Sequence, residues 1–168
     1  EYEIKVPLGT NELQPKVSLL YNSHLTQSRP GILGAGWTLS QSYIERDVNY
    51  TRDITTDDEY KLVLDGISYN LKYVPSENQF HTDPETFLFI KNLTAPAGVN
   101  NFGAYWIVKT KDGTTYRFGF TSNSEAQRNT GSQDYAWRWS LDFVNDTHNN
   151  SISYNYKEDP FPDDFGAV

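Results

Sequence analysis

The sequence predicts an all-β protein built from antiparallel hairpins, with little or no helix. Apolar residues recur with period two along several segments, which is the pattern of a strand with one buried face. Asp-Gly and Asn-Asn pairs separate these segments, and both suit tight turns. No long stretch has the i, i+3, i+4, i+7 apolar spacing of an amphipathic helix. We therefore expect the hairpins to form a twisted sheet, a sandwich or a partly closed barrel.

The first fifty residues are the least regular part of the chain. Residues 15–21 have the character of a strand, and residues 28–36 are expected to form a glycine-rich loop. Residues 37–48 indicate one or two strands, in which Ile44, Arg46 and Val48 share a face.

Three hairpins are predicted after this region. The first turns at Asp65-Gly66, because Asp and Gly tolerate the positive φ of a two-residue type I′ turn. Its apolar faces consist of Tyr60, Leu62 and Leu64 on the outgoing strand and Ile67, Tyr69, Leu71 and Tyr73 on the return. The second turns at Asp112-Gly113. Its return strand carries Tyr116, Phe118 and Phe120 on one face.

The third hairpin turns within residues 146–150, where Asn149 or Asn150 can adopt the left-handed conformation. Its outgoing strand places Trp137, Trp139, Leu141 and Phe143 opposite Arg138, Ser140 and Asp142. Its return strand carries Ile152, Tyr154 and Tyr156. Loops are expected at 75–84, 94–103 and 121–134.

Composition excludes several classes of protein. The 168 residues include no Cys, so a disulfide framework, a thiolate metal site and a cysteine nucleophile are excluded. A net charge of −8 argues against a nucleic-acid-binding surface. No apolar run is long enough to cross a membrane, so we expect no membrane insertion by this segment. We expect one domain at residues 1–156, with 157–168 as a linker or the start of the next module of a longer protein.

The glycine cluster Gly31, Gly34 and Gly36 has the order G-x-x-G-x-G, which is not a dinucleotide-binding fingerprint. We interpret it as a tight loop that brings two backbone segments close together. Trp37, which follows directly, is predicted to be buried.

No catalytic residue, cofactor site or metal site is predicted. His24, His81 and His148 are far apart in sequence and are expected in exposed turns. The acidic groups 57–59 and 159–164 lack the spacing of a calcium loop and suggest exposed turns or charged strand edges. A hydrolase site assembled in space is the remaining enzymatic alternative.

The aromatic residues, 4 Trp, 12 Tyr and 9 Phe, are the feature that most suggests a binding function. Exposed rings could stack on the apolar faces of sugars, and Trp106, Trp137 and Trp139 are the candidate platform. Their alternation with polar residues favours the simpler interpretation that they are core and sheet-face residues.

Several motifs together resemble a known family. They are Val6-Pro-Leu-Gly9, Leu13-Gln-Pro-Lys-Val-Ser-Leu-Leu-Tyr-Asn-Ser23, Gly31-Ile-Leu-Gly-Ala-Gly-Trp-Thr-Leu-Ser40, Ile44-Glu-Arg46, Leu64-Asp-Gly66, Lys111-Asp-Gly-Thr-Thr-Tyr-Arg-Phe-Gly119, Trp139-Ser-Leu-Asp142 and Asp146-Thr-His-Asn-Asn-Ser-Ile-Ser-Tyr-Asn-Tyr156. The family is that of the N-terminal domain of the Salmonella plasmid virulence protein B, of toxin-complex B components and of Rhs (YD-repeat) and wall-associated proteins. The resemblance covers about residues 4–156, and the Gly-x-Gly-Trp-x-Leu-Ser element is its most specific part. Asn149-Asn150 departs from the Gly-Asn pair usual in the family's last turn.

The resemblance implies a non-enzymatic structural module of a large secreted or cell-surface protein. In that family, such β-rich segments contribute to a shell around a separate effector, and the enzymatic and self-cleaving regions lie elsewhere. The expected partners are neighbouring domains of the parent chain, and a glycan or another toxin component is also considered. The alternative is a carbohydrate-binding or adhesion module, which an exposed Trp106 or Trp137 near Asn or Asp would favour.

Overall fold

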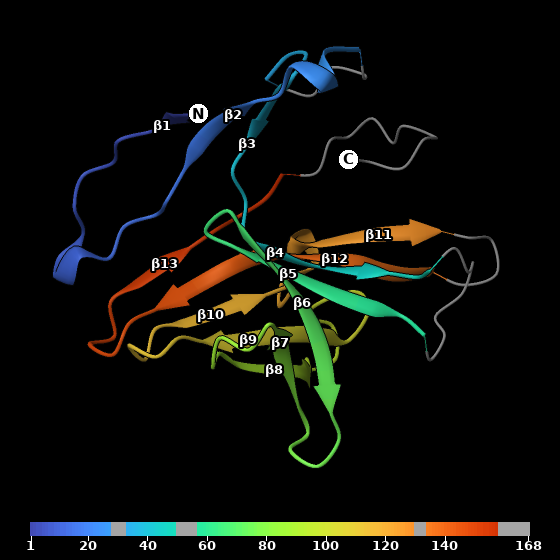
Figure 1. Cartoon of the computed structure of the whole chain (residues 1–168). Helices are drawn as coiled ribbons and strands as arrows, with labels where there is room; N and C mark the ends of the chain where they lie inside the picture. Colours follow the sequence, from blue (N-terminus) through green and yellow to red (C-terminus); the bar gives the residue numbers. More distant parts are fainter. Residues whose placement is uncertain (28–32, 50–56, 130–133, 158–168) are drawn as a thin grey trace.

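The computed structural model describes residues 1–27, 33–49, 57–129 and 134–157, and these form two antiparallel β-sheets (Figure 1). The only helices among the described residues are three short 3-10 turns, η1 (Thr10–Glu12), η2 (Ser23–Gln27) and η3 (Ser122–Ser124). The predicted all-β class is confirmed. Gly31, the acidic group 159–164 and all of the expected linker at 157–168 except Lys157 lie outside the described residues.

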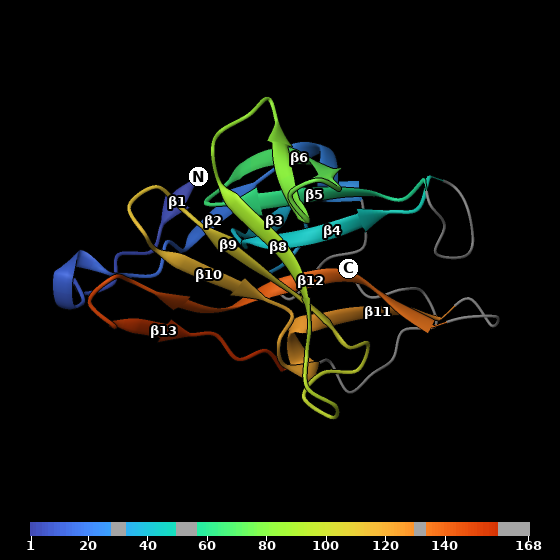
Figure 2. The same cartoon turned by 90° about the horizontal axis from the view of Figure 1, so that it is seen from below.

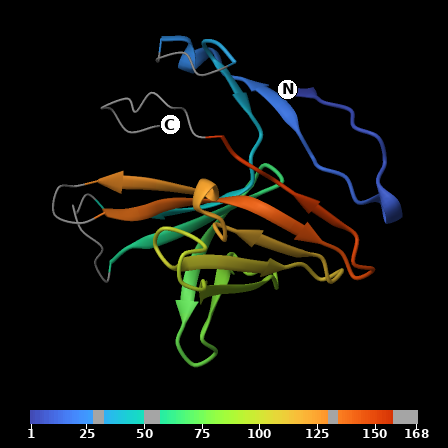
Figure 3. The same ribbon diagram turned by 180° about the vertical axis from the view of Figure 1, so that it is seen from behind.

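The first sheet contains β1 (Tyr2–Glu3), β2 (Ser18–Tyr21) and β3 (Trp37–Leu39), in that order. It stands beside the second sheet in Figures 1 and 3. The loop between β1 and β2 meets the larger sheet, because Lys16 pairs with Asp65 at 2.7 Å and the Asn11 side chain donates to Asp146 at 3.2 Å. The strand expected at 15–21 is shorter than predicted, because β2 begins at Ser18. The segment 37–48 contains two strands, Trp37–Leu39 and Tyr43–Asp47, which belong to different sheets.

The second sheet closes into a barrel, which Figure 2 shows from below. Its ten strands are β4 (Tyr43–Asp47), β5 (Glu59–Leu64), β6 (Ile67–Val74), β7 (Gln79–Asp83), β8 (Phe89–Thr94), β9 (Ala104–Lys109), β10 (Thr115–Phe118), β11 (Glu125–Asn129), β12 (Asp134–Asn145) and β13 (Ser151–Ser153). The pairing of β10 with β12 closes the ring. The predicted loops at 75–84 and 121–134 are wrong in part, because they contain β7 and β11.

Strand β12 organises the barrel because it pairs with four strands. Along one edge it meets β11 and then β10, and along the other it meets β4 and then β13. The 12 residues of β12 can pair with four strands because each neighbour pairs with only part of its length. The third predicted hairpin, β12–β13, is thus also the centre of the fold.

The three predicted hairpins are confirmed. Asp65 and Gly66 have φ values of 52° and 81°, as a type I′ turn requires. In the second hairpin only Gly113 has positive φ, at 88°, and the loop spans more residues than the Asp112-Gly113 pair. In the third, Asn149 takes the left-handed conformation with φ 64°. Asn150 instead donates its side-chain amide to the Asp146 carboxylate.

Asp146 holds the last turn together. Its carboxylate accepts the Asn150 side-chain amide at 2.7 Å and the backbone N–H groups of His148 and Asn150, both at 2.8 Å. These donors stabilise the charged form of the carboxylate, and the Asn150 side chain contributes most, so the pKa of Asp146 is lowered to about 2.

Two β-bulges in β12 change which side chains face the core. Opposite β11, Ala126 pairs with Arg138 and Gln127 with Ala136, so Trp137 is the extra residue. Opposite β10, Arg117 pairs with Phe143 and Phe118 with Leu141, so Asp142 is the extra residue. Strict alternation therefore fails along this strand. The prediction that Trp137 and Phe143 share the inner face with Trp139 and Leu141 is wrong.

The core lies inside the barrel. Its members are Ile44, Leu62, Leu64, Leu71, Ile90, Trp106, Val108, Phe118, Ala136, Trp139, Leu141 and Val144. Val144 takes the place that alternation assigns to Phe143, because of the bulge at Asp142. Phe120 also leaves the predicted inner face: its ring stacks on Arg117, whose guanidinium carbon lies 4.1 Å from the ring centroid.

Candidate functional site

The first bulge turns Trp137 onto the outer face of the barrel. Its neighbours Ala136 and Trp139 are buried, whereas Trp137 is half-buried. The adjacent Arg138 stacks on Tyr43, with its guanidinium carbon 3.5 Å from the ring centroid and 5.6 Å from that of Trp137. A cation–π row therefore runs from β4 to Trp137 and holds the indole against the outside of the sheet.

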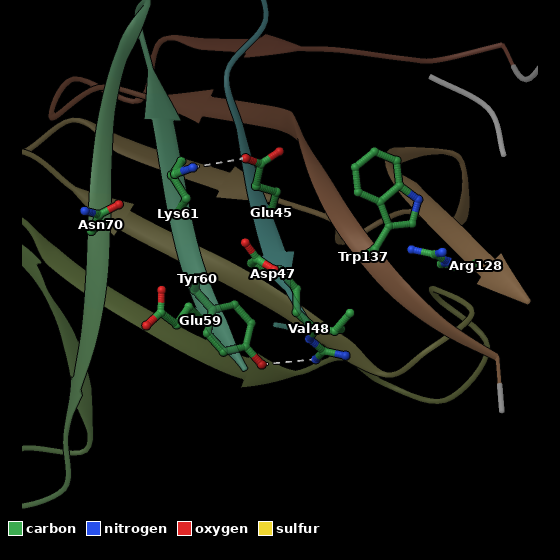
Figure 4. A pocket seen from close by; sticks show the side chains of 10 residues that line it. Glu45, Asp47, Val48, Glu59, Tyr60, Lys61, Asn70, Arg128 and Trp137 are labelled. Atoms are coloured by element: carbon green, nitrogen blue, oxygen red, sulfur yellow. Dashed lines mark hydrogen bonds and ion pairs between the residues drawn. The ribbon is translucent and has the colours of Figure 1, made fainter. Parts of the chain in front are cut away.

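A pocket of about 260 Å³ lies beside Trp137 (Figure 4). Side chains from five strands line it, and most of them are polar or charged. They are Glu45, Arg46, Asp47, Val48, Glu59, Tyr60, Lys61, Asn70, Arg128 and Trp137. Within the pocket, Lys61 and Glu45 form an ion pair at 3.8 Å, and Figure 4 shows Trp137 next to Arg128.

The lining combines one aromatic ring with carboxylates, an amide and cations. An aromatic face can cover the apolar face of a sugar, while Asn70, Asp47 and Arg128 offer acceptors and donors for hydroxyl groups. The described residues contain no group of three His, Asp or Glu side chains arranged to hold a metal ion. The aromatic ring and the polar side chains of the lining suit recognition by stacking and hydrogen bonding.

Arg46 borders the pocket, but its charged group points into the barrel. Only 10% of its side chain is exposed, and it forms an ion pair with Asp58 at 3.5 Å. Its Nη2 donates to the Tyr60 hydroxyl at 3.1 Å, and the rings of Tyr60, Tyr135 and Trp139 lie 5.3–5.7 Å from its guanidinium carbon. The shared face of Ile44 and Arg46 is as predicted. The expectation that Asp58 is an exposed charge is wrong.

The other members of the predicted aromatic platform belong to the core. Trp106 and Trp139 are each 1% exposed, and their ring centroids are 5.8 Å apart. They pack with Tyr60 and Phe80 into one aromatic cluster inside the barrel. Neither ring can reach a ligand, so only Trp137 of the three is available for stacking.

Trp37 is 39% exposed, so the prediction that it is buried is wrong. The glycine before it is as predicted: Gly36 has φ 78°, and a Cβ there would approach the Tyr21 ring at 2.9 Å and the Asn22 carbonyl oxygen at 3.0 Å. Gly34 has φ 93° with open space around it. Gly36 therefore forms a tight turn, as predicted, but Trp37, the first residue of β3, remains partly exposed on the small sheet.

The small sheet has an exposed apolar face. The register Tyr2–Leu19–Leu39 and the pair Tyr21–Trp37 place these residues on one side, with the two aromatic centroids of the pair 5.1 Å apart. The other side carries Glu3, Ser18, Leu20 and Thr38. Of the apolar side, Tyr2 is 66% and Tyr21 51% exposed, which is unusual for clustered aromatic residues on an isolated domain.

The histidines are dispersed, as the sequence indicates, but His81 lies in strand β7 and not in a turn. Its Nδ1 is 2.6 Å from Glu85 and its Nε2 is 3.0 Å from Glu77. Hydrogen bonds to Glu85 and then Glu77 raise the pKa of His81, because both favour the imidazolium form.

Sequence reasoning could have found part of the pocket. Glu45 and Asp47 alternate with Ile44 and Arg46, so their outward direction follows from the strand pattern. Arg128 could not be found, because its segment has the composition of a loop and pairs with β12 only in the folded structure.

Comparison with known proteins gives structural matches alone. Neither the models of known protein families nor the curated proteins match this sequence. The N-terminal domain of the effector protein SpvB from Salmonella typhimurium strain LT2 superimposes with a TM-score of 0.61 and 14% identity. The chain has the fold of the SpvB N-terminal domain. The match covers 92% of this chain and 53% of the SpvB chain, so the chain spans about half of that solved structure.

The SpvB-like fold also occurs in two crystal structures of toxin-complex proteins. TcdB2-TccC3 matches with a TM-score of 0.62 and 17% identity, over 94% of this chain and 8% of that one. TcdB2-TccC3-Cdc42 matches with a TM-score of 0.64 and 17% identity, over 99% and 8%. In both, the SpvB-like fold is a small part of a much longer polypeptide.

Proposed function

We propose that the chain is a non-enzymatic structural module of a larger secreted or surface toxin-like protein. It contributes to a β-rich shell or scaffold that carries a separate effector. The observation that carries this proposal is the apolar face of the small sheet, formed by Tyr2, Leu19, Tyr21, Trp37 and Leu39. A face of this kind is typical of an interface with another part of a protein.

The proposed partner of this face is a further β-rich part of the parent chain. The solved SpvB domain is about twice as long as the matched part, and the toxin-complex chains are longer still. The barrel already buries its own core, so the small sheet is the part that gains most from a covering neighbour.

The test compares the isolated chain with the full parent protein. Trp37→Ser combined with Leu39→Ser is expected to leave the barrel's urea transition unchanged in the isolated chain but to lower the melting temperature of the parent protein. Thr38→Ser, on the opposite face of the same strand, is the control. Equal solvent accessibility of Trp37 to acrylamide in the isolated and parent proteins would refute the proposed packing.

Carbohydrate binding at the pocket beside Trp137 is a second candidate function. It is favoured by the outward indole with Arg128 beside it, and by the polar side chains of Asp47 and Asn70 farther along the same pocket lining (Figure 4). A glycan array is expected to give hits that Trp137→Ala abolishes and that Tyr73→Ala, which removes a half-exposed ring elsewhere, preserves. An array without hits would eliminate this candidate and leave the structural role intact.

A further inference from the structure

Strand β7 carries a histidine whose two ring nitrogens both meet carboxylates. His81 points away from the barrel core, because its neighbours Phe80 and Thr82 face inward. Its Nδ1 lies 2.6 Å from Glu85 in the β7–β8 loop, and its Nε2 lies 3.0 Å from Glu77 in the β6–β7 turn. A neutral imidazole has one N–H group and an imidazolium has two, so only the charged ring can donate to both carboxylates.

Gln79 makes a third contact with the same ring. Its side-chain amide nitrogen is 2.5 Å from the Glu77 carboxylate and 3.0 Å from Nε2 of His81. Nε2 therefore lies between an acceptor and a donor. With a proton it can donate to Glu77, and without one it can accept from Gln79. Turning the amide over would not remove this conflict, because the amide oxygen would then face the Glu77 carboxylate.

Other charged groups lie on the elements packed around His81. They are Glu59 of β5, Lys72 of β6, Asp83 of β7, Lys91 of β8, Lys109 of β9 and Lys111, which follows β9. Lys72, directly opposite His81, pairs with Asp83. Within the described part of the chain no lysine pairs with Glu77 or Glu85, so these two carboxylates are the ionic partners of His81.

We propose that His81 acts as a pH-dependent clasp on the β6–β7 turn. With both nitrogens protonated, the ring joins Glu77 to Glu85 and so ties the turn to the β7–β8 loop. When Nε2 gives up its proton to water, the bare nitrogen accepts from Gln79 and no longer holds Glu77. Nδ1 keeps its proton, because its contact with Glu85 is the shorter of the two.

The direction of the pH dependence follows from the same contacts. Hydrogen bonds to Glu85 and then Glu77 favour the imidazolium form and raise the pKa of His81. The clasp is therefore closed in acid. It opens as the pH rises through a value above the ordinary pKa of histidine, about 6.5.

The turn that the clasp holds projects away from the barrel at the end of β6 and β7 (Figure 1). Its other bonds are local: the Glu77 N–H group donates to the Val74 carbonyl at 3.1 Å, and the Tyr73 hydroxyl donates to the Asn78 side chain at 2.9 Å. The bridge to Glu85 reaches a different loop. Opening the clasp leaves the turn with its local bonds, so we expect the turn to become more mobile.

This inference is independent of the proposed packing of the small sheet and of the pocket at Trp137. The test is NMR spectroscopy of the full chain, labelled with 13C and 15N, from about pH 5 to about pH 9. The ring nitrogens of His81 report its protonation, and relaxation of the Cα carbons of Glu77 and Asn78 reports motion of the turn. We expect Nε2 to lose its proton while Nδ1 keeps its own, and both Cα carbons to become more mobile with the same midpoint. Gly66, in the β5–β6 turn, is the internal control and is expected to stay unchanged.

Two variants separate the acid and neutral states of the clasp. Glu77→Gln removes the acceptor of the acid state and is expected to lower the His81 midpoint by about half a unit or more. Gln79→Ala removes the donor of the neutral state and is expected to raise the midpoint. Glu3→Gln makes the same change in net charge as Glu77→Gln, but in the small sheet, and is expected to leave the midpoint unchanged.

Three outcomes would overturn the proposal. The first is a neutral His81 that keeps its proton on Nε2, because Glu77 would then stay bound. The second is a Glu77→Gln variant with the same midpoint as Glu3→Gln. The third is a turn whose mobility does not change as His81 titrates.

Discussion

Gly119 makes the sharpest test of how the barrel core is packed. It follows the end of β10 with φ 71°, and a Cβ built there would lie 2.8 Å from both Cβ and Cγ of Trp139 and closer still to Cδ1. Trp139 cannot move aside freely, because Tyr60 and Trp106 pack against it. Gly119→Ala therefore forces the backbone into an unfavourable conformation and overpacks the core in one substitution.

The expected loss has two parts. Positive φ costs a residue with a Cβ about 1–2 kcal/mol. Overpacking a core costs about 1–3 kcal/mol more. Gly66→Ala is the matched control, because Gly66 has φ 81° but open space around it, so only the first cost applies. We expect Gly119→Ala to lower the free energy of unfolding by about 2 kcal/mol more than Gly66→Ala does.

The measurement is urea unfolding at equilibrium, followed by tryptophan fluorescence for the wild type and both variants. Because buried Trp139 reports on the core, loss of native structure changes its emission directly. A Gly119→Ala variant that loses no more stability than Gly66→Ala would refute the contact between Gly119 and Trp139, and with it the position of β10 against β12.

Three further predictions concern other parts of the molecule. The pKa of His81 is raised in the folded state, so the contribution of its protonation to the free energy of unfolding is complete below pH about 6.5 and is lost as pH rises through the raised pKa. The free energy of unfolding should therefore fall between pH 6 and pH 8, and His81→Gln should remove this pH dependence. Asp142→Ala should cost about 3 kcal/mol in urea unfolding, because the carboxylate is 1% exposed and its removal leaves Arg117 unpaired, whereas Lys16→Ala, in an exposed pair, should cost less than about 1 kcal/mol. Gly36→Val should lower the thermal stability of the small sheet, so that acrylamide quenching of Trp37 changes at a lower temperature than in the wild type. The same temperature dependence of quenching in both proteins would contradict this.

Part of the candidate surfaces was within reach of sequence reasoning. The outward direction of Glu45 and Lys61 follows from alternation along two strands that were predicted. The position of Arg128 was not, because it lies in β11, and that segment was expected to be a loop.

The sequence by itself determined the local structure of this protein. Period-two patterns predicted the strands of the three hairpins, and Asp65-Gly66, Gly113 and Asn149 set their turns, because these depend on the conformations available to neighbouring residues. The tertiary structure alone decided which aromatic rings are buried. A bulge is a property of two paired strands, so the outward turn of Trp137 depends on β11 and cannot be inferred from β12 alone. Burial likewise depends on what covers a residue, and nothing among the described residues covers Trp37 as the barrel covers Trp106.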